Sequence, residues 1–291
     1  MKIMQYSTPL RYPGGKSRLA NFMRLVITEN NLINGHYIEP FAGGAGLALH
    51  LLFNGYVSRI HVNDLNKSIS AFWHATLEDT DNMCRLIYDT PVDINTWFKQ
   101  KQVQMRSDHY SQLELGFSTF FLNRTNRSGI ISGGVIGGKS QNGDWKLDAR
   151  YNKQDLISRI EKISRFSGQI TLYNRDAAAF ISEELPRLPA NAIVYLDPPY
   201  YTKGSDLYED HYKHEDHVAI SSLIRRINQK WIVSYDDTPQ IRQMYRLYRS
   251  LPYHLSYSAS QHCTGSEIMY FSDRITIPAV ESPVGVKICT P

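Results

Sequence analysis

The sequence Tyr37-Ile38-Glu39-Pro40-Phe41-Ala42-Gly43-Gly44-Ala45-Gly46 begins as a short strand and ends as a glycine-rich turn. The apolar run over residues 47–53 follows directly, so the stretch predicts a strand, a tight turn and a helix. Glycines at such a turn let a ligand approach the backbone and the helix N-terminus. Glu39 would place an anion beside a bound pyrophosphate, so a cationic ligand suits the turn better than a dinucleotide. The alternative is a turn that only packs the helix against the strand.

The rest of the chain alternates between further predicted strands and helices. Strands are expected over residues 59–62, 169–173, 192–196 and 230–234. Helices are expected near residues 65–77, 177–185 and 214–228. Two apolar strands near residues 254–258 and 267–271 would close the sheet. Strands that alternate with helices are typical of a parallel sheet, so the predicted fold class is α/β, with a doubly wound, Rossmann-like core.

About a hundred residues separate the second predicted strand from the third. Helical periodicity marks two parts of this block, residues 94–105 and 110–121. We therefore predict a core of residues 1–92 and 166–291, interrupted by an inserted and mainly helical region of residues 93–165.

Basic charge is concentrated in this insertion. The whole chain carries 32 Lys and Arg against 28 Asp and Glu, a net charge of only +4. Residues 97–165 alone hold twelve basic and six acidic side chains, and six glycines fall within residues 129–143. Guanidinium and amide donors on such a backbone suit phosphates and the edges of bases. The alternative is a solvated, flexible loop.

The stretch Asp197-Pro198-Pro199-Tyr200 follows an apolar predicted strand. Proline has no N–H group, so the carbonyls at this strand end are free to accept hydrogen bonds beside a carboxylate that also only accepts. Such a set would hold an amine and draw its lone pair toward an electrophile. Tyr200 would offer a flat face for stacking. The alternative is a turn stiffened by prolines.

Two further stretches bear on small ligands. Asp64 comes eighteen residues after Gly46, at the end of the next predicted strand, where doubly wound folds reach ribose hydroxyls. Glycine and acid together fit NAD as well as other adenosyl ligands. Gly15-Lys16-Ser17 resembles the end of an ATP-binding loop, but Leu10 stands where the first glycine of that motif is required. ATP binding is therefore not predicted here.

Together these stretches resemble the Dam-like group of DNA adenine methyltransferases, which methylate the N(6) amine of adenine with S-adenosylmethionine. The N-terminal motif is Tyr12-Pro13-Gly14-Gly15-Lys16, and the stretches at Glu39, Asp64 and Asp197 follow it in the order of that group. The resemblance covers most of the chain. It implies that an adenine flipped out of double-stranded DNA reacts beside Asp197.

The resemblance also implies a set of site residues. The catalytic set is Asp197, Pro198, Pro199 and Tyr200. The S-adenosylmethionine set is Tyr12, Lys16, Glu39, Pro40, Phe41, Gly43, Gly44, Gly46, Asp64, Asp176 and Asp197. By this resemblance Tyr12 and Lys16 would cap the cofactor. The DNA-binding set is Arg124, Asn126, Arg127 and Lys139.

The target sequence is not predicted. The segment Leu122-Asn123-Arg124 is similar to the start of the recognition loop of the group. Members that methylate GATC carry Tyr-Asn before the loop glycine and an arginine three residues after it. Here Arg127-Ser128 precedes Gly129 and Ser132 follows, so GATC is not implied.

Other functions and partners stay open at this point. An RNA adenine or protein amide methyltransferase could use the same amine-holding motif, and an inactive DNA-binding relative could keep the fold, but Asp197 and the basic insertion favour DNA. A partnership with a restriction nuclease or a defence system is left open. The chain has no apolar stretch that could span a membrane and no secretory signal, so a cytoplasmic protein is expected.

No metal site is predicted. Cys84, Cys263 and Cys289 lie far apart, which argues against a disulfide framework and a cysteine-type zinc site. His211 and His214 begin a series with His217 at intervals of three, but no carboxylate or cysteine set completes a site. A solvated start of a helix is the expected role of this series.

Overall fold

The structure is a computed structural model that describes residues 7–11, 16–202, 212–259 and 261–286. Two compact units divide the chain. We call residues 16–65 and 175–291 the sheet unit, and residues 1–15 and 66–174 the helical unit.

In the described residues of the sheet unit, six strands follow the order β2-β1-β4-β5-β7-β6. Their bounds are β1 Gly35–Glu39, β2 Val57–Asn63, β4 Ala192–Leu196, β5 Lys230–Asp236, β6 Arg249–Ala259 and β7 Gln261–Phe271. The first four strands pair in parallel, and β7 pairs antiparallel with both β5 and β6. Strand order reverses between β1 and β4, so the connections through helices run outward in both directions, as a doubly wound sheet requires. The predicted Rossmann-like class is confirmed.

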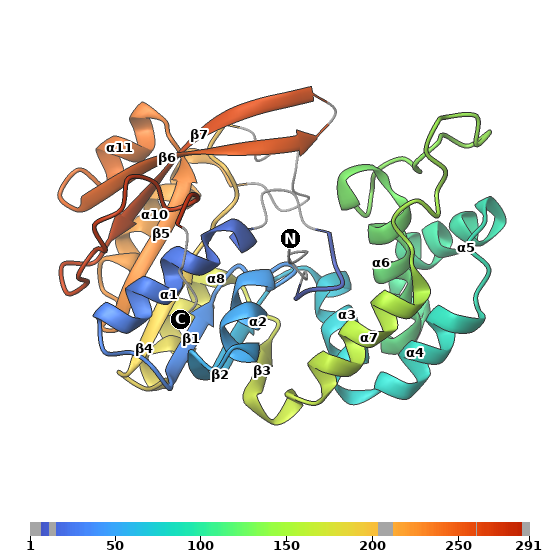
Figure 1. Ribbon diagram of the computed structural model, residues 1–291, viewed down its shortest axis with the longest axis horizontal. Helices are drawn as coiled ribbons and strands as arrows, with labels where there is room; N and C mark the ends of the chain where they lie inside the picture. The colour runs from blue at the N-terminus through green and yellow to red at the C-terminus, as the bar shows by residue number, and fades with distance from the viewer. Residues whose placement is uncertain (1–6, 12–15, 203–211, 260, 287–291) are drawn as a thin grey trace. The chain divides into compact units, whose positions relative to one another are not determined.

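Helix α1 precedes the first strand, and the other helices of the sheet unit lie between strands in the sequence (Figure 1). The bounds of these helices are α1 Ala20–Glu29, α2 Gly46–Phe53, α8 Ala177–Ala179, α10 His214–Ile224 and α11 Pro239–Met244. The predicted helix near residues 177–185 consists of α8, a π turn and a 3-10 turn in succession. Helix α1 was not among the predicted elements, although Phe22, Met23, Val26 and Ile27 form its fully buried face. Ligands of such sheets bind beyond the carboxyl ends of the strands, at the point where the strand order reverses.

Among its described residues, the helical unit has five α-helices and one strand. They are α3 Lys67–Glu78, α4 Thr80–Asp89, α5 Ile94–Met105, α6 Gln112–Thr125, α7 Lys153–Ser164 and strand β3 Ile170–Tyr173. Figure 1 shows the helices gathered into one bundle. Helix α5 has the predicted bounds, whereas α6 begins later than predicted because Ser111 and Glu114 form a capping box at its start.

The longer segment of the helical unit begins at Asn66, earlier than the predicted boundary at residue 93, and continues to Asn174. The physical reason is the close packing of α3 on α6. A Cβ atom at Gly116 would lie 2.5 Å from the carbonyl oxygen of Ala71, so only glycine allows the two helix backbones to approach this closely. Helix α3 therefore packs with the insertion although it directly follows β2 in the sequence.

No helix in the described ranges is long and apolar enough to cross a membrane.

Candidate active site

Asp197 lies at the carboxyl end of β4, after five buried residues of the strand. Its Oδ1 atom accepts a hydrogen bond from Ser234 Oγ at 2.8 Å, and Lys16 Nζ lies 2.9 Å from the same atom. Ser234 belongs to the neighbouring strand β5, and Lys16 begins the 3-10 turn before α1. The side chain of Asp197 is 23% exposed to solvent, whereas that of Lys16 is 5% exposed. The carboxylate is therefore oriented from inside the protein and is still open to a donor from outside.

Lys16 also connects Asp197 to a second buried carboxylate, Glu267. Its Nζ atom donates to the Tyr200 hydroxyl at 3.3 Å and lies 3.6 Å from Glu267 Oε2. The hydroxyls of Tyr200 and Tyr253 each donate to Glu267 at 2.5 Å. Burial alone would lower the pKa of Lys16, but Asp197 and Glu267 outweigh it and hold that pKa well above its ordinary value. The ammonium is thus a fixed positive charge between two carboxylates.

Tyr200 is buried in this arrangement, with 4% of its surface exposed. Its hydroxyl belongs to the network around Lys16 and Glu267, which the sequence did not predict. Lys16, predicted to cap the cofactor, contacts the catalytic motif. The other predicted cap, Tyr12, lies outside the described residues. Glu267 and Tyr253 were missed, although a lone glutamate within the apolar sequence Glu267-Ile268-Met269-Tyr270-Phe271 is the kind of signal that could have marked it.

Glu39 ends strand β1 and is buried. The Tyr37 hydroxyl donates to its Oε1 atom at 2.9 Å. Burial raises the pKa of Glu39 to about 8, although the hydrogen bond from Tyr37 acts in the opposite direction. The carboxyl group is therefore costly to ionise without a positive charge beside it.

The glycine turn after Glu39 is held to the end of β2. Gly43 has a φ of 48°, and its N–H group donates to Asp64 Oδ2 at 2.8 Å. Ala45, just before α2, is also left-handed, with a φ of 45°. Asp64 thus lies against the turn, at the end of the strand where its sequence position predicted it, and holds the turn through Oδ2.

Asn63 connects the same turn to the segment before α8. Its side-chain Nδ2 donates to the carbonyls of Pro40 and Arg175, at 3.0 Å each, and its Oδ1 accepts from the Arg175 N–H at 3.0 Å. Asp176 follows and caps α8, accepting from the N–H groups of Ala178 and Ala179. Asn63 is a positioning residue that the sequence did not indicate.

The carboxyl ends of β1 and β2 and the start of α8 together present three carboxylates, from Glu39, Asp64 and Asp176. This set of acceptors suits a ligand that carries positive charge and hydroxyl groups.

The four predicted DNA contacts lie in the helical unit and differ in exposure. Arg127 is exposed, on a 3-10 turn after α6. Lys139 is exposed, and its Nζ atom lies 5.9 Å from the centre of the Phe98 ring. Arg124 is partly buried, with Nε donating to the Arg150 carbonyl at 2.7 Å and Nη1 to the Pro9 carbonyl at 3.3 Å. Arg124 therefore anchors the loop and the N-terminal segment.

Asn126 requires a correction, because its side chain is fully buried. Its Oδ1 atom accepts from Trp97 Nε1 at 2.7 Å, and its Nδ2 atom donates to the carbonyls of Ile130 and Ile131 at 2.9 Å each. These bonds engage both ends of the amide within the loop. Asn126 shapes the loop, and the structure does not support a direct contact with DNA.

Asn123, one turn earlier on α6, holds the loop to the N-terminal segment. Its amide forms a pair of 2.7 Å hydrogen bonds with the backbone N–H and carbonyl of Arg11, and it also donates to the Gly129 carbonyl at 2.8 Å. Gly129 has a φ of 79°, and a Cβ atom there would lie 2.4 Å from the Arg11 carbonyl oxygen. Only glycine fits, so this loop and this segment are held as one piece.

The histidine series does not gather into a cluster in the described residues. His217 is buried against aromatic rings, and its Nδ1 atom lies 3.2 Å from the Tyr235 hydroxyl. His214 Nδ1 lies 3.0 Å from the Tyr201 hydroxyl, and His211 is outside the described residues. Within the described ranges, no group of three or more His, Cys, Asp or Glu could hold a metal ion.

Comparison with known proteins shows which family this chain is related to. A family model described as D12 class N6 adenine-specific DNA methyltransferase matches residues 12–258. The chain belongs to this family. The methyltransferase is 24% identical over 245 residues to the type II methyltransferase M.CviBI of Paramecium bursaria Chlorella virus NC1A, covering 80% of this chain and 85% of that protein.

Two further relatives have similar coverage. The Retron Ec67 DNA adenine methylase of Escherichia coli is 21% identical over 82% of this chain and 81% of its own length. The type II methyltransferase M.MjaIII of Methanocaldococcus jannaschii is 20% identical over 78% of this chain and 82% of its own length. The resemblance inferred from the sequence motifs is confirmed, and the methyltransferase is an adenine-specific DNA-modifying enzyme by family.

Proposed function

We propose that this methyltransferase transfers the methyl group of S-adenosylmethionine to the N(6) amine of an adenine flipped out of double-stranded DNA. The observation that carries the proposal is the Asp197 carboxylate, which Lys16 and Ser234 hold through Oδ1 while the side chain stays partly exposed. Both described contacts act on one oxygen, so the other oxygen can accept a hydrogen of the target amine. The carbonyls beside Pro198 and Pro199 would accept the second hydrogen.

The chemistry needs little more than this orientation. The adenine amine is a weak nucleophile because its lone pair is delocalised into the ring. Hydrogen bonds from both its hydrogens to fixed acceptors localise the lone pair on nitrogen. Bound S-adenosylmethionine supplies a methyl group on a positively charged sulfur. The amine forms the new N–C bond as the S–C bond breaks, and nitrogen then loses one proton to solvent.

The proposed cofactor site is the glycine turn with its three carboxylates. Glu39 supplies a buried negative charge for a cationic ligand, Asp64 accepts from ribose hydroxyls, and Asp176 lies where an adenine amine could donate. Pro40, Phe41, Gly43, Gly44 and Gly46 form the wall of the turn. We assign Lys16 to the orientation of Asp197 in place of the predicted cofactor cap.

Asp64→Asn tests the ribose contact. Asparagine keeps an oxygen that can accept from Gly43, but it removes the charge. A hydrogen bond to a charged group contributes roughly 1.5–3 kcal/mol, so S-adenosylmethionine affinity should fall by about one to two decades. Calorimetric titration measures this change, with Asp273→Asn as the control because Asp273 is exposed beyond β7. Affinity equal to that of the parent protein would remove Asp64 from the site.

We propose that Arg127 reads a base and that Lys139 contacts phosphate. Both side chains are exposed, and both belong to the helical unit, where the basic charge is concentrated. These two observations support the assignment. Arg127→Ala should cost about 1–3 kcal/mol on the proper site and relax the preference for one base pair. Lys139→Ala should instead weaken binding on all sequences alike and lower the salt slope by about one. Binding to matched and singly substituted duplexes at several salt concentrations separates the two effects, and a uniform loss for Arg127→Ala would contradict its role as a reader.

The overall function is tested by expressing the methyltransferase in a host that lacks DNA methylation and mapping modified bases by long-read sequencing. N(6)-methyladenine at one recurrent sequence is the expected result. Modified RNA or protein with unmodified DNA would favour the alternative substrates.

A functional pairing with a restriction nuclease is a further part of the proposal, supported by the names of two type II relatives. Cleavage of the unmethylated target by an enzyme encoded beside this one would test it.

A further inference from the structure

We infer that Glu267 is a positioning residue of the methyl-transfer site, which divides the Lys16 ammonium between two carboxylates so that Asp197 stays a strong acceptor. Glu267 lies on β7, and the proposed catalytic motif follows β4. This inference rests on the proposed role of Asp197.

The contacts of Glu267 converge on the proposed catalytic motif. Its Oε1 atom accepts from the Tyr200 hydroxyl, and the oxygen of that hydroxyl accepts from Lys16 Nζ at 3.3 Å. Its Oε2 atom accepts from Tyr253 and lies 3.6 Å from Lys16 Nζ. Glu267 therefore holds the ammonium both directly and through the motif tyrosine.

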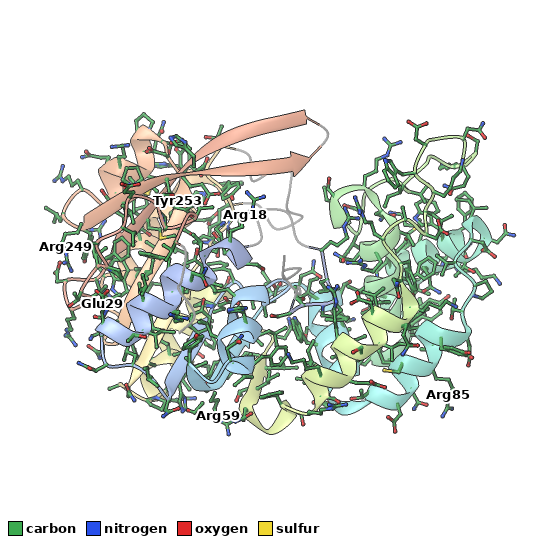
Figure 2. All side chains as sticks on the ribbon, viewed as in Figure 1. Arg18, Glu29, Arg59, Arg85, Arg249 and Tyr253 are labelled. Atoms are coloured by element: carbon green, nitrogen blue, oxygen red, sulfur yellow. The ribbon has the colours of Figure 1, made fainter. Side chains whose placement is uncertain are left out.

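The strand register explains why Glu267 can do this. On β7 it pairs with Tyr253 of β6 on one side and with Asp236 of β5 on the other. Tyr253 is labelled in Figure 2, on the strand next to Glu267. The two carboxylate oxygens of Asp236 accept from the N–H groups of Tyr201 and Thr202, directly after the motif. The antiparallel end of the sheet thus supports the motif at two adjacent points.

Because Glu267 is buried, its carboxylate needs a positive charge and hydrogen-bond donors beside it. Glu267 is 1% exposed, and a buried carboxylate is tolerated when it is paired and fully hydrogen-bonded. Lys16 is the ammonium that both Asp197 and Glu267 contact. If Glu267 lost its charge, Asp197 would be the remaining described carboxylate beside Lys16. Asp197 would then accept the target amine more weakly, because its negative charge would be more fully neutralised.

The central test is Glu267→Gln, which keeps the size and one acceptor oxygen but removes the charge. We expect kcat for DNA methylation to fall by about tenfold or more, with KM for S-adenosylmethionine and for DNA within about threefold of the parent. Glu29→Gln is the matched control, because Glu29 is exposed on α1 of the same unit (Figure 2). A purely structural role would lower the melting temperature and the folded yield and leave kcat per folded molecule unchanged, which would overturn the inference.

A double-mutant cycle identifies the route of the effect, and it remains informative if Glu267→Gln folds poorly alone. In a Lys16→Met background, Glu267→Gln should change kcat by less than about threefold, because the ammonium that Glu267 positions is gone. It should also raise the melting temperature of Lys16→Met, since it removes an unpaired buried charge. A tenfold loss in both backgrounds would show that Glu267 does not act through Lys16. The parent protein on the same DNA reports separately on the proposed function. An inactive parent would refute that function, whereas an active parent with an unchanged kcat for Glu267→Gln would refute this inference alone.

Discussion

Asp197→Ala is expected to abolish methylation and to leave DNA binding largely intact. The carboxylate is the acceptor that orients the target amine, and the contacts proposed for DNA lie in the other unit, at Arg127 and Lys139. Without Asp197 the adenine nitrogen keeps a delocalised lone pair, and Lys16 is left with Glu267 as its remaining described carboxylate. Loss of one such preorganised group typically costs about two to three decades in kcat, and here the loss also misplaces Lys16.

Single-turnover methylation and duplex-binding assays of the purified variant measure the two quantities separately. Asp273→Ala is the control, since it removes an exposed carboxylate of the same unit. Methylation within a few fold of the parent enzyme would contradict the catalytic role of Asp197. Loss of DNA binding in parallel with activity would instead show that Asp197 supports the fold of the whole site.

Glu39→Gln is expected to weaken cofactor binding and to stabilise the protein in the absence of cofactor. Burial raises the pKa of Glu39 to about 8 in the folded state, against an ordinary value of 4.5. Between pH 4.5 and 8 the unfolded chain carries an ionised carboxylate where the folded chain holds a proton. Stability therefore falls as pH rises through this window, and the loss is complete above about pH 8. Glutamine does not titrate, so the variant escapes this loss.

The stability gain should be on the order of a few kcal/mol at pH 8.5 and should disappear at pH 4.5 and below. Cofactor affinity should change in the opposite sense. In the parent protein, affinity for the cationic ligand should increase as pH rises toward 8 and Glu39 ionises, whereas in the variant it should be low and independent of pH over this range. Denaturant unfolding and calorimetric titration at both pH values test these expectations, with Glu29→Gln as the exposed control. A variant that is no more stable at pH 8.5, or that binds S-adenosylmethionine like the parent, would contradict the role of Glu39.

Local sequence signals determined the elements that surround the site. The strand at residues 35–39, the left-handed turn through Gly43 and helix α2 depend on neighbouring residues, because backbone conformation and apolar periodicity act over a few positions. The placement of Asp197 after an apolar strand follows from the same local pattern. The motifs resembling the family could therefore be recognised without tertiary information.

The recognition loop shows where such signals stop. Asn126 and Arg127 are adjacent polar residues, and both were predicted to bind DNA. Asn126 is fully buried, whereas Arg127 is exposed. Their difference comes from Trp97, on a helix almost thirty residues earlier, which donates to Asn126 and draws that side chain inward. Composition cannot separate the two residues, because the bond that separates them joins distant parts of the chain.

The α/β class, the order of the motifs, the glycine turn and the acceptor motif at Asp197 all follow from the amino-acid sequence. How those parts act on one another depends on the folded protein. Lys16, Asp197 and Glu267 lie in three distant parts of the chain, and their ion pairs exist because the paired strands β4, β5 and β7 bring Asp197, Ser234 and Glu267 to one end of the sheet. The Lys16 ammonium acts on Asp197 and Glu267 because it lies within a few ångströms of both carboxylates. Strand pairing across the sheet creates this proximity, and no local stretch of sequence encodes it.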